Sequence, residues 1–208
     1  KAGPEDVLVR ITAHNRGPDA ATLHLLPTLW FRNTWSWKGG GSKPVIEAIG
    51  GTASSVVRAR HTDPLFQESL EDYYLYTEAK APWLFTDNET NHARLFGSPN
   101  AGPFVKDGIN DLLIHGRTGA VNPALTGTKV AAHHTLSIGP NTSKVVRLRL
   151  TRAAPVKGGK PFADFDRVFG LRLAEADAFY DGITPPEVQA DPDRATVVRQ
   201  ALAGMLWT

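Results

Sequence analysis

The chain of 208 residues contains no cysteine. Disulfide bonds, thiolate nucleophiles and cysteine-ligated zinc sites are therefore excluded, and the absence fits a cytoplasmic protein. No apolar run reaches the roughly 18 residues that a membrane-spanning helix needs, so we expect no membrane partner. An excess of one charge is also missing, because 23 basic residues stand against 21 acidic ones and the formal net charge is only +2. We therefore expect no nucleic acid partner.

The composition is that of a globular protein with a core of its own. Hydrophobic residues make up 41% of the chain and charged residues 21%. This is the usual proportion for a soluble domain. The length accommodates one large β domain, or one domain followed by a fragment of another.

The first forty residues show the alternation typical of strands. Val7, Val9 and Ile11 fall on one face of residues 7–13. A turn cluster at residues 15–19 separates this strand from a second one at 23–31, so the pair reads as a β-hairpin. Pro27 interrupts the second strand and indicates an edge or a bulge, because proline cannot donate to the ladder.

Further short strands follow along the chain. They are predicted at residues 44–49, 53–60, 72–78 and 82–86. A second hairpin is predicted from residues 129–138 and 146–151, joined by the turn at Gly139 to Asn141. Many short strands with frequent turn signals indicate an antiparallel β-sandwich, here over residues 1–155.

The pattern changes after residue 155. Residues 156–162 have the glycine and proline content of a linker, and residues 163–208 then show helical spacing. One helix ends near Gly182, and a second begins at the N-cap Asp191 and Pro192. The second helix has an apolar face and no terminating signal before Thr208. We read the chain as a piece of a longer protein and expect the isolated fragment to self-associate through this face.

Four segments carry a resemblance to a known family. They are AGPEDVLVRITAHNRGPDAATLHLLPTLWFRNTWSW (2–37), LFTDNETNHARLFG (84–97), VKDGINDLLIHGRTGAVNPALTGTKVAAHH (105–134) and VRQALAGMLWT (198–208). They resemble the N-terminal region of bacterial glycoside hydrolases of the family 63 type, which are related to mannosylglycerate hydrolases. The resemblance implies a mainly β fold, a large antiparallel sandwich of the supersandwich type, followed by two helices that begin an (α/α)6 barrel. It also places both catalytic carboxylates in the barrel, so no catalytic residue is expected in this chain.

A tryptophan-rich segment is the sharpest local feature. Three of the five tryptophans fall within residues 30–37, and a run of three glycines follows at 39–41. Indole faces stack on sugar rings, and amide and guanidinium groups bind hydroxyls, so substrate-binding residues are expected here. They are Arg32, Asn33, Trp35 and Trp37. The alternative is that these indoles pack in the sandwich or against a missing domain, and Trp30 is interpreted as such a packed strand residue.

Other polar clusters have a structural interpretation beside a functional one. The oxygen-rich residues 87–91 could bind calcium, although a loop turn uses the same residue types. Asp107 and Asp111 are spaced for one helix face and could form an acid–base pair, but a solvated helix turn is the commoner arrangement. His134 lies on an apolar strand face and reads as a hydrogen-bonded core residue. No metal site or cofactor is predicted.

Three functions remain open at this point. The first is a non-catalytic N-terminal domain of a glycoside hydrolase acting on glucosides or mannosides, whose partners are carbohydrate and the C-terminal helical barrel of the same polypeptide. The second is a self-sufficient carbohydrate-binding module. The third is a mutarotase-like sugar isomerase. The apolar helical tail favours the first, because neither alternative needs an uncapped helix at its end.

Overall fold

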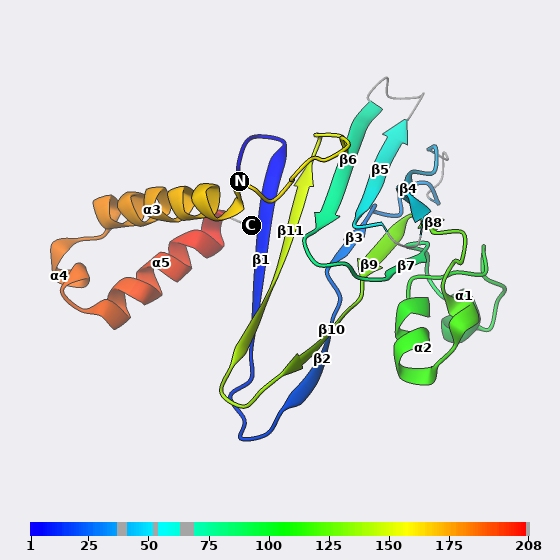
Figure 1. Ribbon diagram of the computed structural model, residues 1–208, viewed down its shortest axis with the longest axis horizontal. Coiled ribbons are helices and arrows are strands. Elements are labelled where there is room, and N and C mark those ends of the chain that lie inside the picture. The colour runs from blue at the N-terminus through cyan, green and yellow to red at the C-terminus, as the bar shows by residue number, and fades with distance from the viewer. Residues whose placement is uncertain (37–40, 52–53, 63–68, 207–208) are drawn as a thin grey trace. The chain divides into compact units, whose positions relative to one another are not determined.

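A computed structural model of the protein describes residues 1–36, 41–51, 54–62 and 69–206 (Figure 1). Two compact units are present. The larger unit is formed by residues 3–162, and the smaller one by residues 163–208 with Lys1 and Ala2. None of the helices in the described part of the chain is long and apolar enough to cross a bilayer.

The larger unit is mainly β, as predicted. Its strands are β1 (Asp6–His14), β2 (Ala21–Leu25), β3 (Thr28–Trp30), β4 (Val45–Ala48), β5 (Val56–Thr62), β6 (Ser69–Thr77), β7 (Trp83–Thr86), β8 (Thr126–Gly127), β9 (Lys129–Ala132), β10 (His134–Ile138) and β11 (Ser143–Thr151). They form a six-stranded sheet in the order β1-β11-β6-β5-β4-β8, a three-stranded sheet β3-β9-β7 and a two-stranded sheet β10-β2. The pairings between these strands are antiparallel.

Both predicted hairpins are wrong in their pairing, although their strands exist. β1 pairs with β11, so that Ile11 faces Val146, and β2 pairs with β10, so that Leu23 faces Leu136 (Figure 1). Each turn therefore carries the chain from one sheet to another instead of closing a hairpin. The Asn15 side chain connects the two turn regions, because its Nδ2 donates to the carbonyl of Ile138 at 2.9 Å.

The break at Pro27 has a structural role. The predicted continuous strand at 23–31 is divided into β2 and β3, which belong to different sheets. Pro27 lies between them, and its carbonyl accepts a hydrogen bond from the Ala132 amide at 3.0 Å. A residue that lacks an N–H fits this position, where the chain leaves one ladder and enters the next.

One hydrophobic core lies between the six-stranded and the three-stranded sheet. The buried residues of this cluster are Ile46, Val57, Ala59, Leu75, Ala81, Trp83, Phe85, Val130, Ala132, Val146 and Leu148. They alternate along their strands, as residues on one face of a sheet must. The buried indole N–H of Trp83 has a hydrogen-bond partner, because it donates to the Ser54 carbonyl at 2.9 Å.

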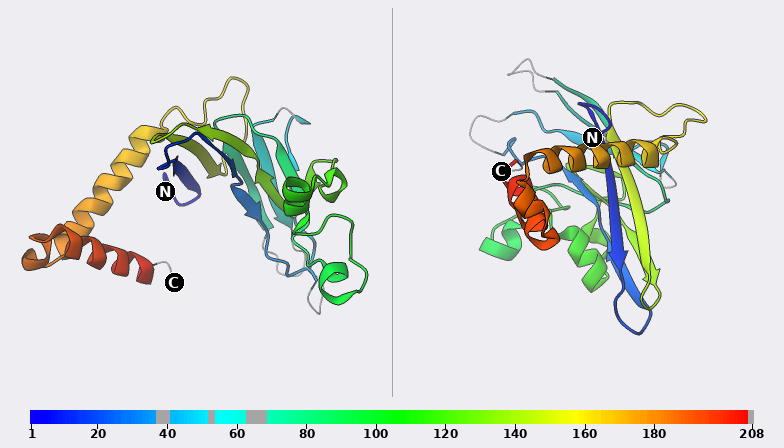
Figure 2. Two further views of the ribbon diagram at one scale, coloured as in Figure 1. Left: turned by 90° about the horizontal axis from the view of Figure 1, so that it is seen from below. Right: turned by 90° about the vertical axis from the view of Figure 1, so that its left-hand side faces the viewer.

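Two short helices lie on the other side of the three-stranded sheet. They are α1 (His92–Phe96) and α2 (Gly108–His115), drawn in green in Figure 2. Ile109 of α2 packs with Leu84 and Ala131 in a second buried cluster. A 3₁₀ turn, Thr118–Ala120, follows α2.

The smaller unit consists of the two predicted helices and a short helix between them that the sequence pattern did not indicate. They are α3 (Phe165–Ile183), the short α4 (Pro186–Gln189) and α5 (Pro192–Leu206). The predicted cap at Asp191 is confirmed, since its Oδ1 accepts hydrogen bonds from the amides of Asp193 and Arg194. Val197, Met205 and Leu206 are exposed on α5.

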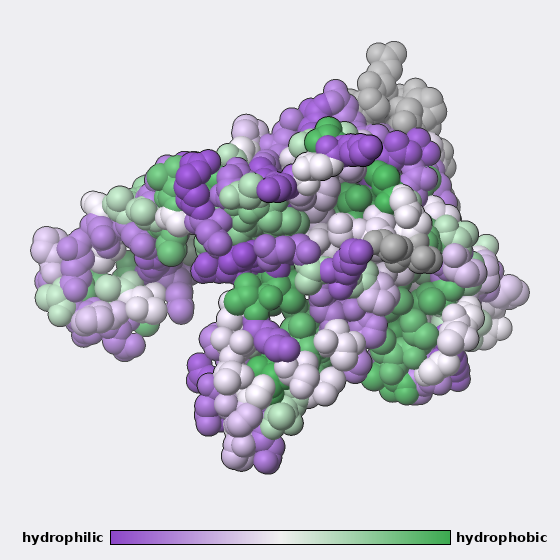
Figure 3. Space-filling view, viewed as in Figure 1, coloured by the Kyte–Doolittle hydropathy of each residue, from purple (hydrophilic) through white to green (hydrophobic). Residues whose placement is uncertain are grey.

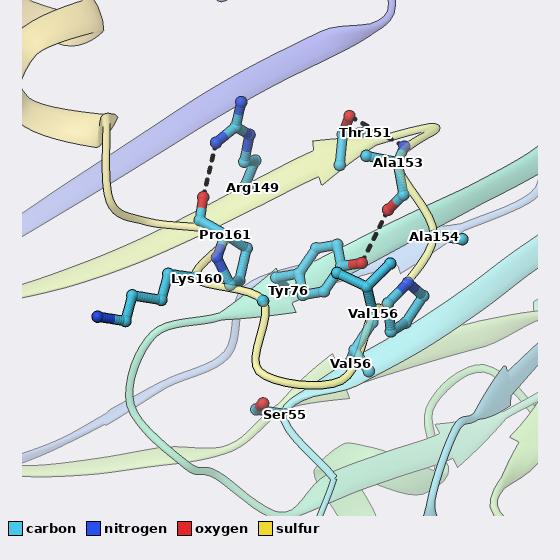
Figure 4. Close-up of a pocket in the computed structure, with 12 residues that line it drawn as sticks. Ser55, Val56, Tyr76, Arg149, Thr151, Ala153, Ala154, Val156, Lys160 and Pro161 are labelled. Carbon is cyan, nitrogen blue, oxygen red and sulfur yellow. Dashed lines mark hydrogen bonds between the residues drawn. The ribbon is translucent and has the colours of Figure 1, made fainter.

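Residues 152–162, which include the predicted linker 156–162, are bound to the outer face of the six-stranded sheet (Figure 4). The Tyr76 hydroxyl donates to the Ala153 carbonyl at 2.8 Å, and the Arg149 guanidinium donates to the Pro161 carbonyl at 2.6 Å. Phe162 packs against the buried cluster formed by Val56, Tyr74 and Tyr76. A cavity of about 370 Å³ lies between this segment and the sheet.

Candidate functional site

The tryptophan-rich segment begins where β3 ends and is held by a neighbouring loop. The Phe31 amide donates to the Thr128 carbonyl at 3.0 Å, and the Phe31 carbonyl accepts from Asn88 Nδ2 at 2.9 Å. Both backbone groups of Phe31 are therefore satisfied by residues distant in sequence. This fixes the direction in which residues 32–35 leave the sheet.

Trp35 is positioned by a carboxylate. Its indole N–H donates to Glu89 Oε1 at 3.0 Å. Lys43 Nζ lies 3.7 Å from the same oxygen and 2.8 Å from Asp87 Oδ2. These four residues form what we call the Trp35 network. This hydrogen bond is made at the edge of the indole ring. It therefore fixes the orientation of the ring without occupying either of its faces.

The Trp35 network also shows which groups the side chains of residues 87–91 bind. Their carboxylates bind an ammonium and an indole of the same chain. The described residues contain no group of three or more histidine, aspartate or glutamate side chains arranged to hold a metal ion. The turn interpretation of residues 87–91 accounts for these contacts without a calcium ion.

Two of the remaining predicted site residues, Arg32 and Asn33, precede Trp35 in the same segment. Arg32 is exposed and Asn33 is half-buried. Asn33 Oδ1 is buried and has no hydrogen-bond partner among the residues that the structure describes. Trp37 lies outside the described residues. Sequence reasoning missed Glu89 and Lys43, because nothing in their local pattern shows that they meet Trp35.

Trp30 is not the packed residue that the strand pattern suggested. Its side chain is 57% exposed. Leu29 takes the core position on β3, so Trp30 belongs to the opposite face of an edge strand. Trp30 borders an apolar hollow of about 210 Å³, whose other residues are Leu29, Phe31, Ala59, Tyr73 and Leu150. An exposed indole beside an apolar hollow is a surface available for contact with a ligand or with another part of the polypeptide.

The two carboxylates of α2 form a structural network. Arg94 Nη2 donates to both carboxylate oxygens of Asp111 at 2.7 Å, and Arg94 Nη1 also binds Asp107. The hydrogen bond from Arg94 lowers the pKa of the Asp111 carboxyl. Asp111 is buried, so the expected solvated helix turn is wrong for this residue. Both carboxylates hold α1 against α2, which leaves neither of them placed as a general acid.

Three histidines gather where β9 passes into β10. His24 Nδ1 and His133 Nε2 lie 2.8 Å apart, with their rings stacked. His134 is buried, as predicted, and its Nε2 lies 3.2 Å from Thr77 Oγ1. Burial lowers the pKa of both His133 and His134, and the neighbouring histidine lowers each further. The neutral imidazoles are therefore the stable forms in the folded protein.

We expect stability to fall on acidification below about pH 6.5, the ordinary pKa of histidine. The unfolded chain protonates His133 and His134 there while the folded protein does not, so protons favour unfolding until the lowered folded pKa is passed. Above that pH the contribution is fully present. Melting temperatures from about pH 8 to about pH 5 test this, and His134→Gln should flatten the decline. The exposed His14→Gln should leave it unchanged, and equal slopes in all three proteins would contradict the assignment.

Comparison with known proteins adds one relative. No protein-family profile matches the chain. The uncharacterized protein YMR196W of Saccharomyces cerevisiae is 32% identical over 232 aligned residues, which include 99% of this chain. The chain spans 21% of that protein's length, so it is similar to about one fifth of a much larger polypeptide.

Proposed function

We propose that this chain is the non-catalytic N-terminal domain of a glycoside hydrolase that acts on glucoside or mannoside substrates. In this proposal the larger unit is an antiparallel supersandwich, and the helices of the smaller unit begin an (α/α)6 catalytic barrel. The domain packs on that barrel, and the segment around residues 32–42 contributes to the rim of the active site.

The observation that carries the proposal is the presentation of residues 30–35 at the surface. Trp30 is largely exposed beside an apolar hollow, and Trp35 is oriented by Glu89 through its ring edge. Arg32 and Asn33 lie between them in the chain. Aromatic faces with adjacent polar groups are the usual elements of a sugar-binding surface.

The fold is compatible with this role. Two antiparallel sheets share one core, and helices follow the β unit in the chain. The resemblance to family 63-type hydrolases implies the same order of elements. The much greater length of the yeast relative leaves room for a catalytic domain elsewhere in such a polypeptide.

A self-sufficient carbohydrate-binding module is the second candidate. The hollow beside Trp30 favours it, because this surface is complete within the larger unit and could bind a sugar without a barrel. The two candidates differ in what the chain does alone. A module binds its sugar fully as residues 1–208, whereas a rim domain needs the catalytic barrel.

Kinetics of the full-length polypeptide test the proposal. Aryl glucosides and mannosides should be hydrolysed by the full-length protein and not by residues 1–208 alone. In the full-length protein, Trp35→Ala should lower kcat/KM by about 5- to 30-fold, which corresponds to about 1–2 kcal/mol of lost stacking. The melting temperature should change little.

Trp35→Phe is the matched control, because it keeps an aromatic face while removing the bond to Glu89. It should retain most of the activity that Trp35→Ala loses. The proposal fails if residues 1–208 alone approach the turnover of the full-length protein. It also fails if Trp35→Ala lowers the melting temperature but leaves kcat/KM unchanged.

A further inference from the structure

A third cavity lies beside α2, apart from the Trp35 network. Its volume is about 400 Å³, within the range of small-molecule sites. The residues that line it are His24, Leu26, Thr28, Lys106, Ile109, Asn110, Leu113, Ile114 and Lys129. They come from β2, β3, β9, α2 and the connections beside them, so the cavity is formed entirely within the larger unit. We call it the α2 cavity.

Its charge is of one sign. Lys106 and Lys129 line the cavity, and none of its lining residues in the described part of the chain carries a carboxylate. Lys129 is half-buried, and its Nζ donates to the Lys106 carbonyl at 2.8 Å. Within the described residues no carboxylate forms a salt bridge with Lys129. Asp107 acts on it electrostatically from a distance, but that carboxylate binds Arg94 and Asn91.

A partly buried ammonium without a counter-charge is energetically unfavourable. Burial and the proximity of Lys106 both lower the pKa of the Lys129 ammonium, and burial is the larger effect. An anion placed beside Nζ would oppose both effects on the pKa, since it would stabilise the charged ammonium in place of the lost solvent and would attract both lysines. The cavity is therefore complementary to negative charge.

Hydrogen-bond donors are available at the same place. Lys129 Nζ carries three N–H groups and uses one of them on the Lys106 carbonyl. The side-chain amide of Asn110 makes no hydrogen bond within the described part of the chain. His24 also lines the cavity, and its Nδ1 lies 2.8 Å from His133 Nε2. Carboxylate and phosphate groups accept hydrogen bonds from the ammonium of Lys129 and from the amide of Asn110.

The other wall of the cavity is apolar. Leu26, Ile109, Leu113 and Ile114 form it. Ile114 is 69% exposed, and the space-filling view shows an apolar patch over α2 (Figure 3). A ligand that carried only charge would leave this wall in water. The complementary ligand has a charged end and a compact hydrocarbon part.

We propose that the α2 cavity binds a small organic anion, in which a carboxylate or a phosphate monoester is attached to a short apolar chain. The anionic group lies at Lys129 and Lys106, and the hydrocarbon part lies against Ile109, Leu113 and Ile114. This site shares no lining residue with the Trp35 network or with the hollow beside Trp30, although Lys129 lies opposite Trp30 in the ladder between β3 and β9.

Calorimetric titration of residues 1–208 with three six-carbon probes tests the site. Hexanoate and hexyl phosphate should bind saturably at millimolar concentrations or below, and the tighter of the two identifies the preferred anion. Uncharged 1-hexanol should bind at least about tenfold more weakly, and added salt should weaken both anions. Absence of saturable binding by either anion, or equal binding of 1-hexanol, would overturn the proposal.

Lys129→Met removes the charge and keeps an unbranched side chain of nearly the same length. It should weaken the better anion by at least about tenfold. Lys144→Met, a change at an exposed lysine of β11, is the control and should bind like the unmodified chain. Equal affinity in all three proteins would refute the site. If Lys129→Met does not fold, an NMR titration of the unmodified chain with hexanoate takes its place. A saturable change in the chemical shift of the Asn110 side-chain amide supports the site, and an unchanged shift refutes it.

Discussion

Replacing Phe85 by alanine is expected to lower the free energy of unfolding by about 3–5 kcal/mol, the usual effect of deleting a fully buried aromatic ring. Phe85 has no exposed surface and lies in the cluster between the six-stranded and three-stranded sheets. Deletion of its ring leaves a cavity lined by both sheets, which cannot both move inward while their ladders persist. Urea denaturation measures the loss.

Phe96→Ala is the matched control. Phe96 ends α1 and is 69% exposed, so the same chemical change should alter the free energy of unfolding by no more than about 0.5 kcal/mol. Similar losses in both variants would mean that the core is not located between these two sheets.

Replacing Gly108 by alanine is expected to destabilise the protein by about 2–3 kcal/mol, although alanine normally favours a helix over glycine. A Cβ at Gly108 would lie 2.1 Å from the Ala120 carbonyl oxygen and 3.1 Å from its carbon. These are backbone atoms, so no side-chain rotation relieves the clash. The first turn of α2 must move away from the 3₁₀ turn at Thr118–Ala120.

Gly119→Ala is the control for that substitution. Gly119 is next to Ala120, and a Cβ built on it meets no atom within 4 Å. This variant should be neutral or slightly stabilising, since alanine reduces the freedom of the unfolded chain. Chemical denaturation of both variants gives the comparison. A stable Gly108→Ala protein would mean that α2 is not packed as closely on the following turn as the structure has it.

The losses of stability expected for Phe85→Ala and Gly108→Ala concern the two faces of the three-stranded sheet. Phe85 supports the three-stranded sheet from its core side, whereas Gly108 allows α2 to approach from the other side. Leu84 and Ala131 present the outward face of the same sheet to Ile109. The α2 cavity borders this packing, so Gly108→Ala should also weaken hexanoate binding, whereas Gly119→Ala should not.

The sequence by itself determined many of the local elements and their character, but it did not indicate α1, α4 or the 3₁₀ turn. Alternation along residues 7–13 and 146–151 identified β1 and β11, and helical spacing with a cap at Asp191 identified α3 and α5. Pro27 marked the boundary between β2 and β3 because a proline cannot donate to a ladder. These features depend on residues within a few positions of one another, so they can be read from the chain.

Only the tertiary structure decided which segments meet. Alternation shows that a strand has an apolar face, but it does not show which strand lies beside it. β1 pairs with β11 and not with β2, which follows it in the chain. The same holds for the side chains. Trp30 is exposed because β3 is an edge strand, and Asp111 is buried against Arg94 of another helix. Trp35 meets Glu89, and the Lys129 ammonium meets the Lys106 carbonyl, through contacts between residues far apart in the chain. Such contacts depend on how the sheets close around one core, which no local pattern encodes.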